Sequence, residues 1–448
     1  MDVSQLRKQA KELVRAARAG DASALARFGG REVILARAQL VIARENGFAS
    51  WPALVLAAEA NVEGFVRAAT SGRCERASRL LSDEIARDPW AALVLGRGWD
   101  GDAKKPGGPL GWAPLLYVTH SCFASVELAR GLLARGADPN ATFANEYGQM
   151  SALYGAAGVV HSPEVTRVLL DAGASPDDGE SVYHSVEAPD PACLALLIEH
   201  GAQLDGTNGL AHALDFERPE HVRMMLEAGA DASGVLGHAV RRGRGSELIG
   251  LLAAHGADLD GLAGETWRGD APLRTPYQHA VLRGMTDVAE TLASLGASTE
   301  VSADDLAVAA LGRGETASVP RSLDYDQQEV VIMAALRGHL DVVVDAVGPD
   351  FGGVVGGSPW GRLIHHGAWV GSPTVVGRLL ERGADSVAES GAEFSTPLAW
   401  CYLGSQYWDI PERDYVAVAR LLLDAGASYE DRFEEVAAGP LADASLSA

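Results

Sequence analysis

Apolar residues recur at helical spacing along most of this chain, and each helical run ends in the same short phrase. The phrase is Gly-Ala followed by a polar residue, and it occupies residues 136–138, 173–175, 201–203, 229–231, 256–258, 296–298, 383–385 and 426–428. Self-similarity at a period of tens of residues means that each unit cannot bury its own apolar face and must stack on its neighbours. The pattern predicts one elongated stack of helix pairs.

The two helices expected in each unit differ in composition. The first is rich in Ala and Gly, and the second carries paired aliphatic residues such as Val168, Leu169 and Leu170. The Gly of the closing phrase is expected just beyond the second helix, where a residue without a Cβ takes the left-handed conformation at little cost. The phrase is therefore interpreted as a helix stop signal.

The first 60 residues lack the phrase and predict a small helical cap. Leu6, Leu13 and Val14 fall at helical spacing, and Gly20 breaks this pattern before two shorter helices that reach residue 45. Ser50 is the expected N-cap of a fourth helix. A stack needs such a cap, because an exposed terminal interface would be a large apolar surface.

Three segments resemble the ankyrin repeat, whose unit opens on T-P-L-H-x-A and is about 33 residues long; they are residues 275–298, 363–385 and 396–400. Thr275 and Pro276 match the opening, Gln278 replaces its His, and His365 occupies that His position while Arg362 and Leu363 displace the Thr-Pro. The resemblance implies an all-α fold, an ankyrin-type α-solenoid of stacked helix pairs. It divides the chain into a cap (1–60), a solenoid of about eleven units, several degenerate (61–430), and a tail (431–448).

Two departures from the ankyrin pattern change the expected shape of the units. The phrases between residues 173 and 256 recur at roughly 28 residues, which is short of a full repeat, so β-hairpin fingers are expected to be short or missing there. The gap from 296 to 383 is expected to hide two degenerate units, near residues 303–314 and 329–348. Residues 178–187, the following segment and the Tyr-rich last unit are similar to bacterial ankyrin-repeat proteins with an N-terminal helical cap, a group that implies no settled activity.

Composition restricts the partners and the compartment. The formal net charge of −23 disfavours nonspecific nucleic-acid binding, which depends on Lys and Arg releasing counterions. The four cysteines, Cys74, Cys122, Cys193 and Cys401, are far apart and form no C-x-x-C pair, which argues against a disulfide framework and a thiolate zinc site. A reducing cytoplasm fits this usage, and the sequence shows neither a signal-peptide h-region nor a membrane span.

Signatures of familiar enzymes are missing from the sequence. There is no G-x-x-x-x-G-K-[ST], no G-x-G-x-x-G between a strand and a helix, no G-x-S-x-G and no H-E-x-x-H. The glycine-rich segment 351–361 lacks the Lys of a phosphate loop, and a hairpin between units is the preferred interpretation. No metal and no cofactor are expected, and the Gly- and Lys-rich residues 87–114 are the best candidate for a mobile flap.

A column of histidines falls at nearly the same place in successive first helices: His184, His212, His238, His279 and His366. Imidazole is a common metal ligand and titrates near neutrality. Adjacent units are spaced by about 10 Å, which exceeds the reach of two ring nitrogens bound to one metal. Hydrogen bonds to a neighbouring turn are therefore the preferred role.

A second set of side chains is expected to line the groove of the stack. As contacts to a partner, the sequence offers His120, Tyr154, Tyr183, Phe216, Arg241, Arg242, Trp369, Tyr407 and Trp408. Large aromatic residues and Arg dominate binding energy at interfaces. The alternative is a solvated polar face with routine ion pairs.

Two function classes remain open from the sequence. The preferred one is a non-enzymatic cytoplasmic scaffold that binds a protein or peptide in its groove, with no nucleic acid and no membrane among its partners. The alternative is a small-molecule isomerase, cyclase or hydrolase that uses Glu180, His184, Glu187 and Asp215 for acid/base chemistry. A helix-capping role for Glu180 and Asn208 is the ordinary explanation of those two positions.

Overall fold

The computed structural model describes residues 3–29, 33, 35–264, 272–355, 358–390, 395–407, 410, 412–428 and 440–441. The chain divides into two compact units. The first unit comprises Met1–Lys8, Ile42–Val235 and Gly250–Asp258, and the second comprises Gln9–Val41, Leu236–Ile249 and Leu259–Ala448. The division into cap, solenoid and tail stays a prediction.

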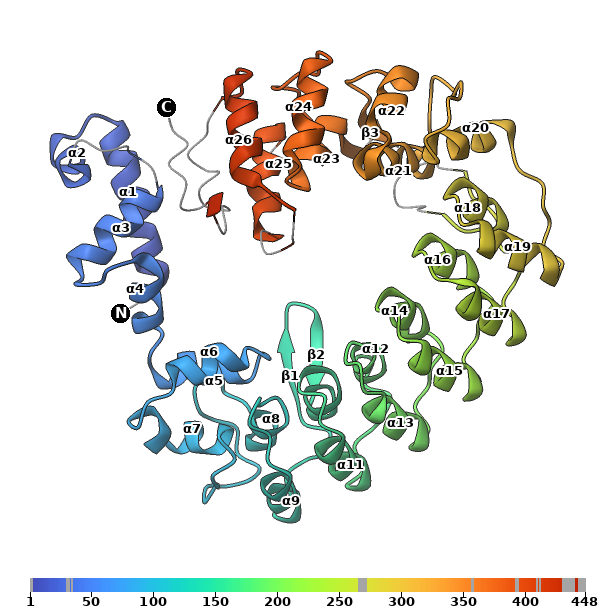
Figure 1. The fold of residues 1–448 in the computed structure, drawn as a ribbon. Coiled ribbons are helices and arrows are strands. Elements are labelled where there is room, and N and C mark those ends of the chain that lie inside the picture. The colour runs from blue at the N-terminus through green and yellow to red at the C-terminus, as the bar shows by residue number, and fades with distance from the viewer. Residues whose placement is uncertain are drawn as a thin grey trace. The chain divides into compact units, whose positions relative to one another are not determined.

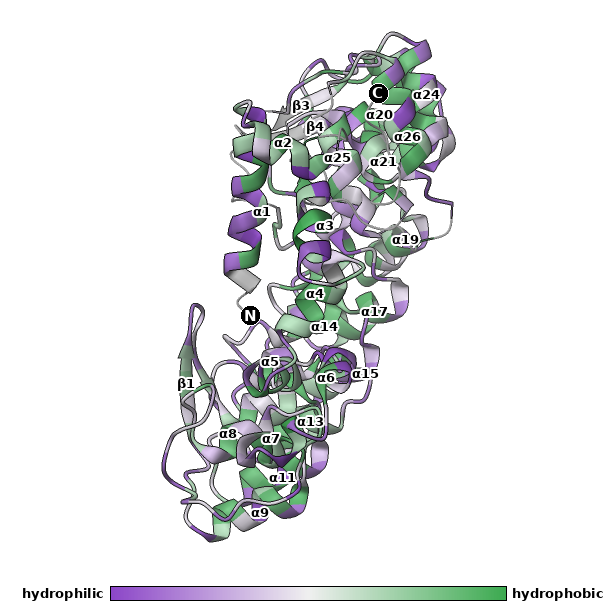
Figure 2. Ribbon diagram, turned by 90° about the vertical axis from the view of Figure 1, so that its left-hand side faces the viewer, coloured by the Kyte–Doolittle hydropathy of each residue, from purple (hydrophilic) through white to green (hydrophobic). Residues whose placement is uncertain are grey.

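The N-terminal residues form four helices, as their hydrophobic spacing predicts. They are α1 (Val3–Arg18), α2 (Ala22–Phe28), α3 (Leu35–Glu45) and α4 (Trp51–Ala58). Helix α1 is amphipathic, with Leu6 and Leu13 buried among its polar positions, and hydrophilic and hydrophobic stretches alternate along its ribbon (Figure 2). Ser50 caps α4, because its side chain accepts a hydrogen bond from the amide of Ala53. Of these helices, α4 belongs to the first unit, α2 belongs to the second, and α1 and α3 run across the boundary between the two ranges.

From α5 on, the first unit is built of stacked helix pairs (Figure 1). Its elements are α5 (Val62–Ala69), α6 (Cys74–Leu80), η1 (Ile85–Arg87), α7 (Pro89–Val94), α8 (Pro114–Thr119), α9 (Val126–Ala134), β1 (Thr142–Asn145), β2 (Gly148–Ser151), α10 (Ala152–Tyr154), η2 (Gly155–Val159), α11 (Pro163–Asp171), α12 (Ser181–Ser185), α13 (Ala192–Glu199), α14 (Gly209–Asp215) and α15 (Pro219–Glu227). Helices α8, α10, α12 and α14 contact one another in order, as do α9, α11, α13 and α15. Leu116, Leu153, Leu169, Leu197 and Leu214 are buried in the core of these pairs.

The second unit is also built of helices packed side by side. Its elements are α16 (Leu236–Arg241), α18 (Pro276–Leu282), α19 (Thr286–Leu295), α20 (Ala303–Gly312), α21 (Tyr325–Ala334), η4 (Ala335–His339), α22 (Leu340–Val347), β3 (Gly352–Val355), β4 (Ser358–Arg362), α23 (Leu363–Trp369), α24 (Pro373–Glu381), α25 (Pro397–Gly404), η5 (Ser405–Tyr407) and α26 (Tyr415–Asp424). Helix α17 (Ser246–Ala254) runs across the boundary between the two ranges. The hydrophobic core of the second unit includes Val308, Val331, Ile364 and Leu398.

The degenerate stretch between residues 296 and 383 differs in part from expectation. Helices α21 and α22 form the second expected unit, but α20 packs directly on α21, and the residues between those two helices, all of them described, form no helix. The first degenerate unit is therefore a single helix. The fold as a whole is an all-α, ankyrin-type solenoid of stacked helix pairs with few hairpins.

The repeated Gly-Ala phrase ends its helix as predicted. All eight of its glycines have a positive φ, from 80° at Gly201 to 100° at Gly296. In five of the eight phrases the third residue also joins neighbouring repeat units, because its backbone N–H donates to a side-chain oxygen one repeat unit earlier. The five acceptor and donor pairs are Asn140 and Ser175, Asp177 and Gln203, Asp205 and Asp231, Asp260 and Ser298, and Asp350 and Asp385. A repeat unit is one helix pair, as distinct from the two compact units into which the chain divides. We call this contact between successive repeat units the unit-to-unit link.

Two hairpins interrupt the helices. Strands β1 and β2 pair antiparallel, with Thr142 opposite Ser151, and project on the side of the first unit that carries α12 and α14 (Figure 1). Strands β3 and β4 also pair antiparallel, which confirms the hairpin interpretation of the glycine-rich segment 351–361. Residues 173–256, all of them described, contain no strand, so the shortened middle units do lack fingers.

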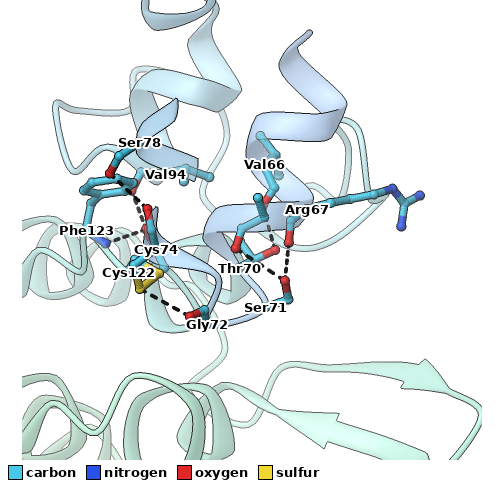
Figure 3. Close-up of a disulfide and its surroundings, with 12 residues drawn as sticks. Val66, Arg67, Thr70, Ser71, Gly72, Cys74, Ser78, Val94, Cys122 and Phe123 are labelled. Atoms are coloured by element: carbon cyan, nitrogen blue, oxygen red, sulfur yellow. Dashed lines mark hydrogen bonds between the residues drawn. A yellow bond between two sulfur atoms is a disulfide. The ribbon is translucent and has the colours of Figure 1, made fainter. Parts of the chain in front are cut away.

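The expectation that the cysteines form no disulfide is wrong. Cys74 and Cys122 are joined by a disulfide, with their Cα atoms 5.6 Å apart although 48 residues separate them in sequence (Figure 3). Stacking of one unit on the next brings them together, which sequence spacing does not reveal. Cys193 and Cys401 are buried and free, and burial raises the pKa of the Cys193 thiol to about 11. Among the described residues, no helix has both the length and the apolar character needed to cross a membrane.

The stretch expected to be a mobile flap is instead anchored. Its first residues form α7, and the indole of Trp90 contacts Trp99 and Tyr117 at ring-centroid distances of 4.5 and 5.0 Å. The Tyr117 hydroxyl accepts from the amide of Leu110 and donates to the carbonyl of Gly107, each at 2.8 Å. These aromatic contacts hold the loop against the helix pairs.

Candidate functional site

Helix α12 and the residues that flank it bring three of the four acid/base candidates into contact. Nδ1 of His184 lies 2.6 Å from a carboxylate oxygen of Glu187, and Nε2 lies 3.3 Å from Glu180. The three residues sit one helical turn apart at i, i+4 and i+7, so they share one face of α12 and its end. Both nitrogens of His184 therefore face carboxylates of its own unit.

The next unit extends this arrangement through His212. Its Nε2 lies 3.2 Å from the same Glu187 oxygen that faces His184, and its Nδ1 lies 3.8 Å from Asp215. All four predicted acid/base residues are thus connected in one chain of alternating carboxylates and imidazoles. His212 belongs to the predicted histidine column, but its place in this series of carboxylates and imidazoles was not predicted.

Aromatic rings flank the chain of carboxylates and imidazoles. Tyr154 lies 5.2 Å from the ring of His184, Tyr183 stacks on His212 at 3.8 Å, and Phe216 meets His212 edge-on at 4.9 Å. We call the eight residues together the acid–aromatic face; they are Tyr154, Glu180, Tyr183, His184, Glu187, His212, Asp215 and Phe216. Tyr154, Tyr183 and Phe216 were among the predicted partner contacts, and the structure places them with the acid/base candidates.

The charge of this face acts on its two phenols. The pKa of Tyr154 is raised by burial and then by the nearby carboxylates of Glu180 and Glu187. The pKa of Tyr183 is raised by burial and then by Asp215, Glu187 and Glu180. Both phenols therefore remain protonated hydrogen-bond donors at neutral pH, and they lie beside an excess of negative charge.

A cation closes one end of the face. The guanidinium of Arg218 lies over the ring of Phe216, 5.8 Å from its centroid, and donates to the backbone carbonyl of Glu187 at 3.0 Å. This cation–π contact holds Phe216, which is 41% exposed, against its neighbours. Arg218 was not among the predicted residues, although its place two positions after Phe216 in the turn that follows α14 was a usable signal.

The expected capping role of Glu180 and Asn208 is wrong. Neither side chain caps its helix. Asp178 performs that role for α12, because one of its oxygens accepts from the amides of Glu180 and Ser181 at 3.1 and 2.8 Å. The other oxygen accepts from the hydroxyls of Ser181 and Ser151. Glu180 is thereby left to contact His184.

Two predicted partner contacts are not accessible, which corrects the expectation. His120 is 2% exposed, its Nδ1 donates to the carbonyl of Leu116 at 3.0 Å, and burial lowers its pKa to about 4. Arg241 is directed at the fully buried Asp326, with its Nε 3.5 Å from a carboxylate oxygen. Helical position alone does not distinguish a groove-facing side chain from one that a neighbouring unit covers. Arg242, the next residue, is exposed.

The second unit carries an aromatic cluster of its own. Trp369, which is 36% exposed, lies 6.0 Å from Trp400 and 6.1 Å from Tyr407, and Trp400 also contacts His366. The predicted anchors Trp369 and Tyr407 are therefore neighbours, and Trp408 lies outside the described residues. Trp400 was missed as a site residue although it belongs to the TPLAW segment that carries the family resemblance.

The finger of the first unit offers one further aromatic residue. Tyr147 is 82% exposed in the turn between β1 and β2, where Asn145 accepts hydrogen bonds from the amides of Tyr147 and Gly148 at 2.8 and 3.1 Å. An Asn at the first position of such a turn is a recognisable signal. Among the described residues, no group of three His, Cys, Asp or Glu side chains is arranged to hold a metal ion.

Comparison with known proteins gives likenesses in structure only. Neither a family profile nor a curated protein matches the sequence. A crystal structure of the human ASB11 ankyrin repeat domain superposes with a TM-score of 0.36 at 20% identity, covering 52% of this chain and 98% of that one. The ankyrin repeat domain of Bcl-3, described as a unique member of the IkappaB protein family, gives a TM-score of 0.34 at 24% identity, covering 44% of this chain and 89% of that one.

Proposed function

We propose that this chain is a protein-binding scaffold and that the acid–aromatic face contacts its partner. The observation that carries the proposal is the position of the face on successive first helices, with the exposed ring of Phe216 at one end and half-buried phenols along it. Exposed rings fixed by their neighbours lose little conformational entropy on binding, which is why aromatic residues dominate interface energies.

The charge of the face indicates the chemistry of the partner. Glu180, Glu187 and Asp215 provide three carboxylates, each with a third or so of its side chain exposed. Carboxylates beside aromatic rings suit Lys or Arg side chains, which gain both an ion pair and a cation–π contact. The partner segment is therefore expected to be basic.

The test is photo-cross-linking from the face itself. Phe216 is replaced by a benzophenone amino acid in the full chain, and the matched control carries the same group at Arg223 on α15, whose side chain is 42% exposed. We expect a discrete adduct from position 216 that disappears when Asp215→Lys is added to the same chain. Equal adducts from both positions, or none from 216, would contradict the proposal.

The small-molecule enzyme remains a second candidate because its four acid/base residues do meet. Each ring nitrogen of His184 and His212 lies 2.6 to 3.8 Å from a carboxylate oxygen of Glu180, Glu187 or Asp215. No ring nitrogen of these two residues is therefore left directed at a substrate. This arrangement favours a positioning role for the imidazoles over general base catalysis.

The enzyme candidate has its own experiment. A metabolite mixture incubated with the wild-type chain and with Glu187→Gln is compared by mass spectrometry. An isomerase, cyclase or hydrolase would deplete a compound only in the wild-type sample. Identical profiles would eliminate the acid/base role of Glu187 and leave the scaffold. A cytoplasmic location and the absence of nucleic-acid and membrane partners remain predictions.

A further inference from the structure

A cleft of about 820 Å³ opens in the first unit and contains no residue of the acid–aromatic face. Its lining comes from the end of α4, from α5 and from the start of α6, together with Leu110, Trp112 and Phe143 from later in the chain. Its volume is in the range of clefts that hold small molecules or short peptide segments.

The cleft is positive in a chain that is strongly negative. Arg67 pairs with Glu63 at 2.9 Å, and Arg76 pairs with Glu59. The side chain of Arg73 is exposed and makes no ion pair or hydrogen bond with any described residue. Three guanidiniums against two carboxylates leave one net positive charge, and Arg73 presents it.

An aromatic wall stands in the same cleft. The indole of Trp112 stacks on the ring of Phe143 with centroids 3.9 Å apart, and it also contacts Tyr117 at 5.5 Å. The hydrogen bonds of the Tyr117 hydroxyl to the loop before Trp112 hold this wall in place. A fixed flat apolar surface accepts a side chain with little loss of entropy.

The disulfide braces the turn that carries Arg73. Cys74 follows Arg73 directly and is bonded to Cys122, whose amide also donates to the carbonyl of Ala69 at 3.0 Å. Figure 3 shows Thr70 and Ser71, both lining residues, on the turn beside this bond. The position of the Arg73 backbone is therefore tied to the unit that supplies Trp112.

We propose that this cleft binds an acidic segment of a partner protein, with a carboxylate on Arg73 and an adjacent aromatic or aliphatic side chain against Trp112 and Phe143. The inference rests on the proposed scaffold role but concerns a separate surface and a partner segment of opposite charge. A peptide fits better than a polyphosphate, because Glu59 and Glu63 already pair with two of the three guanidiniums.

The first test is selection of random dodecapeptides displayed on phage against the full chain under non-reducing conditions, with Arg73→Glu as the counter-selection. Arg73 is exposed, so folding is not at stake in this variant. We expect a consensus that places Asp or Glu next to Trp, Phe or Leu. A consensus without an acidic residue, or no enrichment over the counter-selection, would overturn the proposal.

The second test measures the affinity of the selected peptide by fluorescence polarisation. Arg73→Glu and Trp112→Ala are each expected to weaken binding by about tenfold or more, as for central interface residues. Arg79→Glu is the matched control, because Arg79 lies on α6, the helix that begins just after Arg73, has a side chain that is 71% exposed and is not in the lining. Equal losses in Arg73→Glu and Arg79→Glu would show a general charge effect and overturn the assignment.

The third test addresses the brace. Dithiothreitol reduces the disulfide to two thiols by transferring two electrons and is itself oxidised to its cyclic disulfide. We expect reduction to weaken peptide binding about threefold or more in the wild type and to leave the Cys74→Ser, Cys122→Ser variant unchanged. Alkylation of the denatured chain should add two groups without reductant and four with it. Four without reductant would refute the brace, while cross-linking from position 216 would still report on the acid–aromatic face.

Discussion

The carboxylate of Asp326 is fully buried and faces three guanidinium groups. Arg283 lies 3.0 Å from it, Arg241 3.5 Å and Arg274 3.7 Å, and Arg274 also contacts Asp305 and Asp324 at 2.7 Å each. Removing one partner of such a group leaves the remaining buried charges without compensation. The resulting loss of folding stability is larger than the loss caused by replacing the whole group with apolar residues.

Replacing Asp326 by Ala is therefore expected to lower the free energy of unfolding of the second unit by about 3–5 kcal/mol. Asp341, half exposed beside Arg378, is the control, and its replacement by Ala should cost less than about 1 kcal/mol. Denaturant titration followed by circular dichroism measures both. Similar midpoints for the two variants would show that the network does not hold the unit together.

The buried His120 is expected to make the stability of the first unit depend on pH. Its folded-state pKa of about 4 lies below the 6.5 of an ordinary histidine because it is buried, so on acidification the unfolded chain takes up a proton first. Its contribution to stability is complete above pH 6.5 and is lost as the pH falls toward 4, by about 3 kcal/mol.

The measurement is the denaturation midpoint of the wild type and of His120→Asn between pH 7 and pH 4. Asn keeps a donor for the carbonyl of Leu116 but does not titrate. The variant should lose less stability than the wild type over this range. Parallel curves would mean that His120 is not the titrating group.

At this scale the sequence predicted which residues matter better than where they point. The four acid/base candidates and three aromatic residues do meet, because helical periodicity fixes the face of a helix on which a residue lies. His120 and Arg241 share that periodicity, but His120 is packed against the rings of Trp112, Phe143 and Tyr154, and Arg241 faces the carboxylate of Asp326. Those contacts are set by stacking, so local spacing could not reveal them.

Successive units are held by the unit-to-unit link as well as by their apolar faces. In the middle of the first unit the link joins Asp177 to the amide of Gln203 and Asp205 to that of Asp231, at 2.7 and 2.8 Å. A carboxylate that accepts from a backbone N–H is a charge-assisted hydrogen bond. Each helix pair is thereby fixed to the next at the same end.

Substitution of Asp205 tests the link. Asp205→Ala should lower the stability of the first unit by about 1–2 kcal/mol, because the amide of Asp231 loses its acceptor. Asp205→Asn retains an acceptor oxygen at that position and should lose less stability than Asp205→Ala. Hydrogen exchange of the Asp231 amide gives a local measurement, and equal protection in all three proteins would contradict the role.

Element boundaries were more predictable than element partners. The Gly-Ala phrase located the ends of the helices, because a positive φ favours glycine, and the 28-residue spacing predicted the missing fingers. The single helix α20 and the Cys74–Cys122 disulfide were not predicted. Both depend on contacts between units, for which a degenerate or isolated residue leaves no periodic signal.

The net charge of −23 acts on the whole molecule. It repels polyanions at long range and attracts cations, and both effects weaken as salt shortens the screening length. The positive cleft near Arg73 is a local exception to this field.

A duplex DNA probe should therefore not bind the chain at about 150 mM salt, whereas association of a fluorescent oligoarginine peptide should slow severalfold between about 50 and 500 mM salt. Electrophoretic mobility of the duplex and stopped-flow mixing of the peptide are the measurements. A shifted duplex, or a peptide rate that salt does not change, would contradict the long-range role of the charge.

Both links in the middle of the first unit span 26 residues from acceptor to donor, and their acceptors are 28 residues apart. A duplicated block of 28 residues, inserted between Asp177 and Asp205, would carry its own acceptor carboxylate and its own donor amide. Insertion or deletion of whole 28-residue blocks therefore keeps each unit-to-unit link in this part of the chain. The number of stacked helix pairs can change there without a change in the surfaces that pack together.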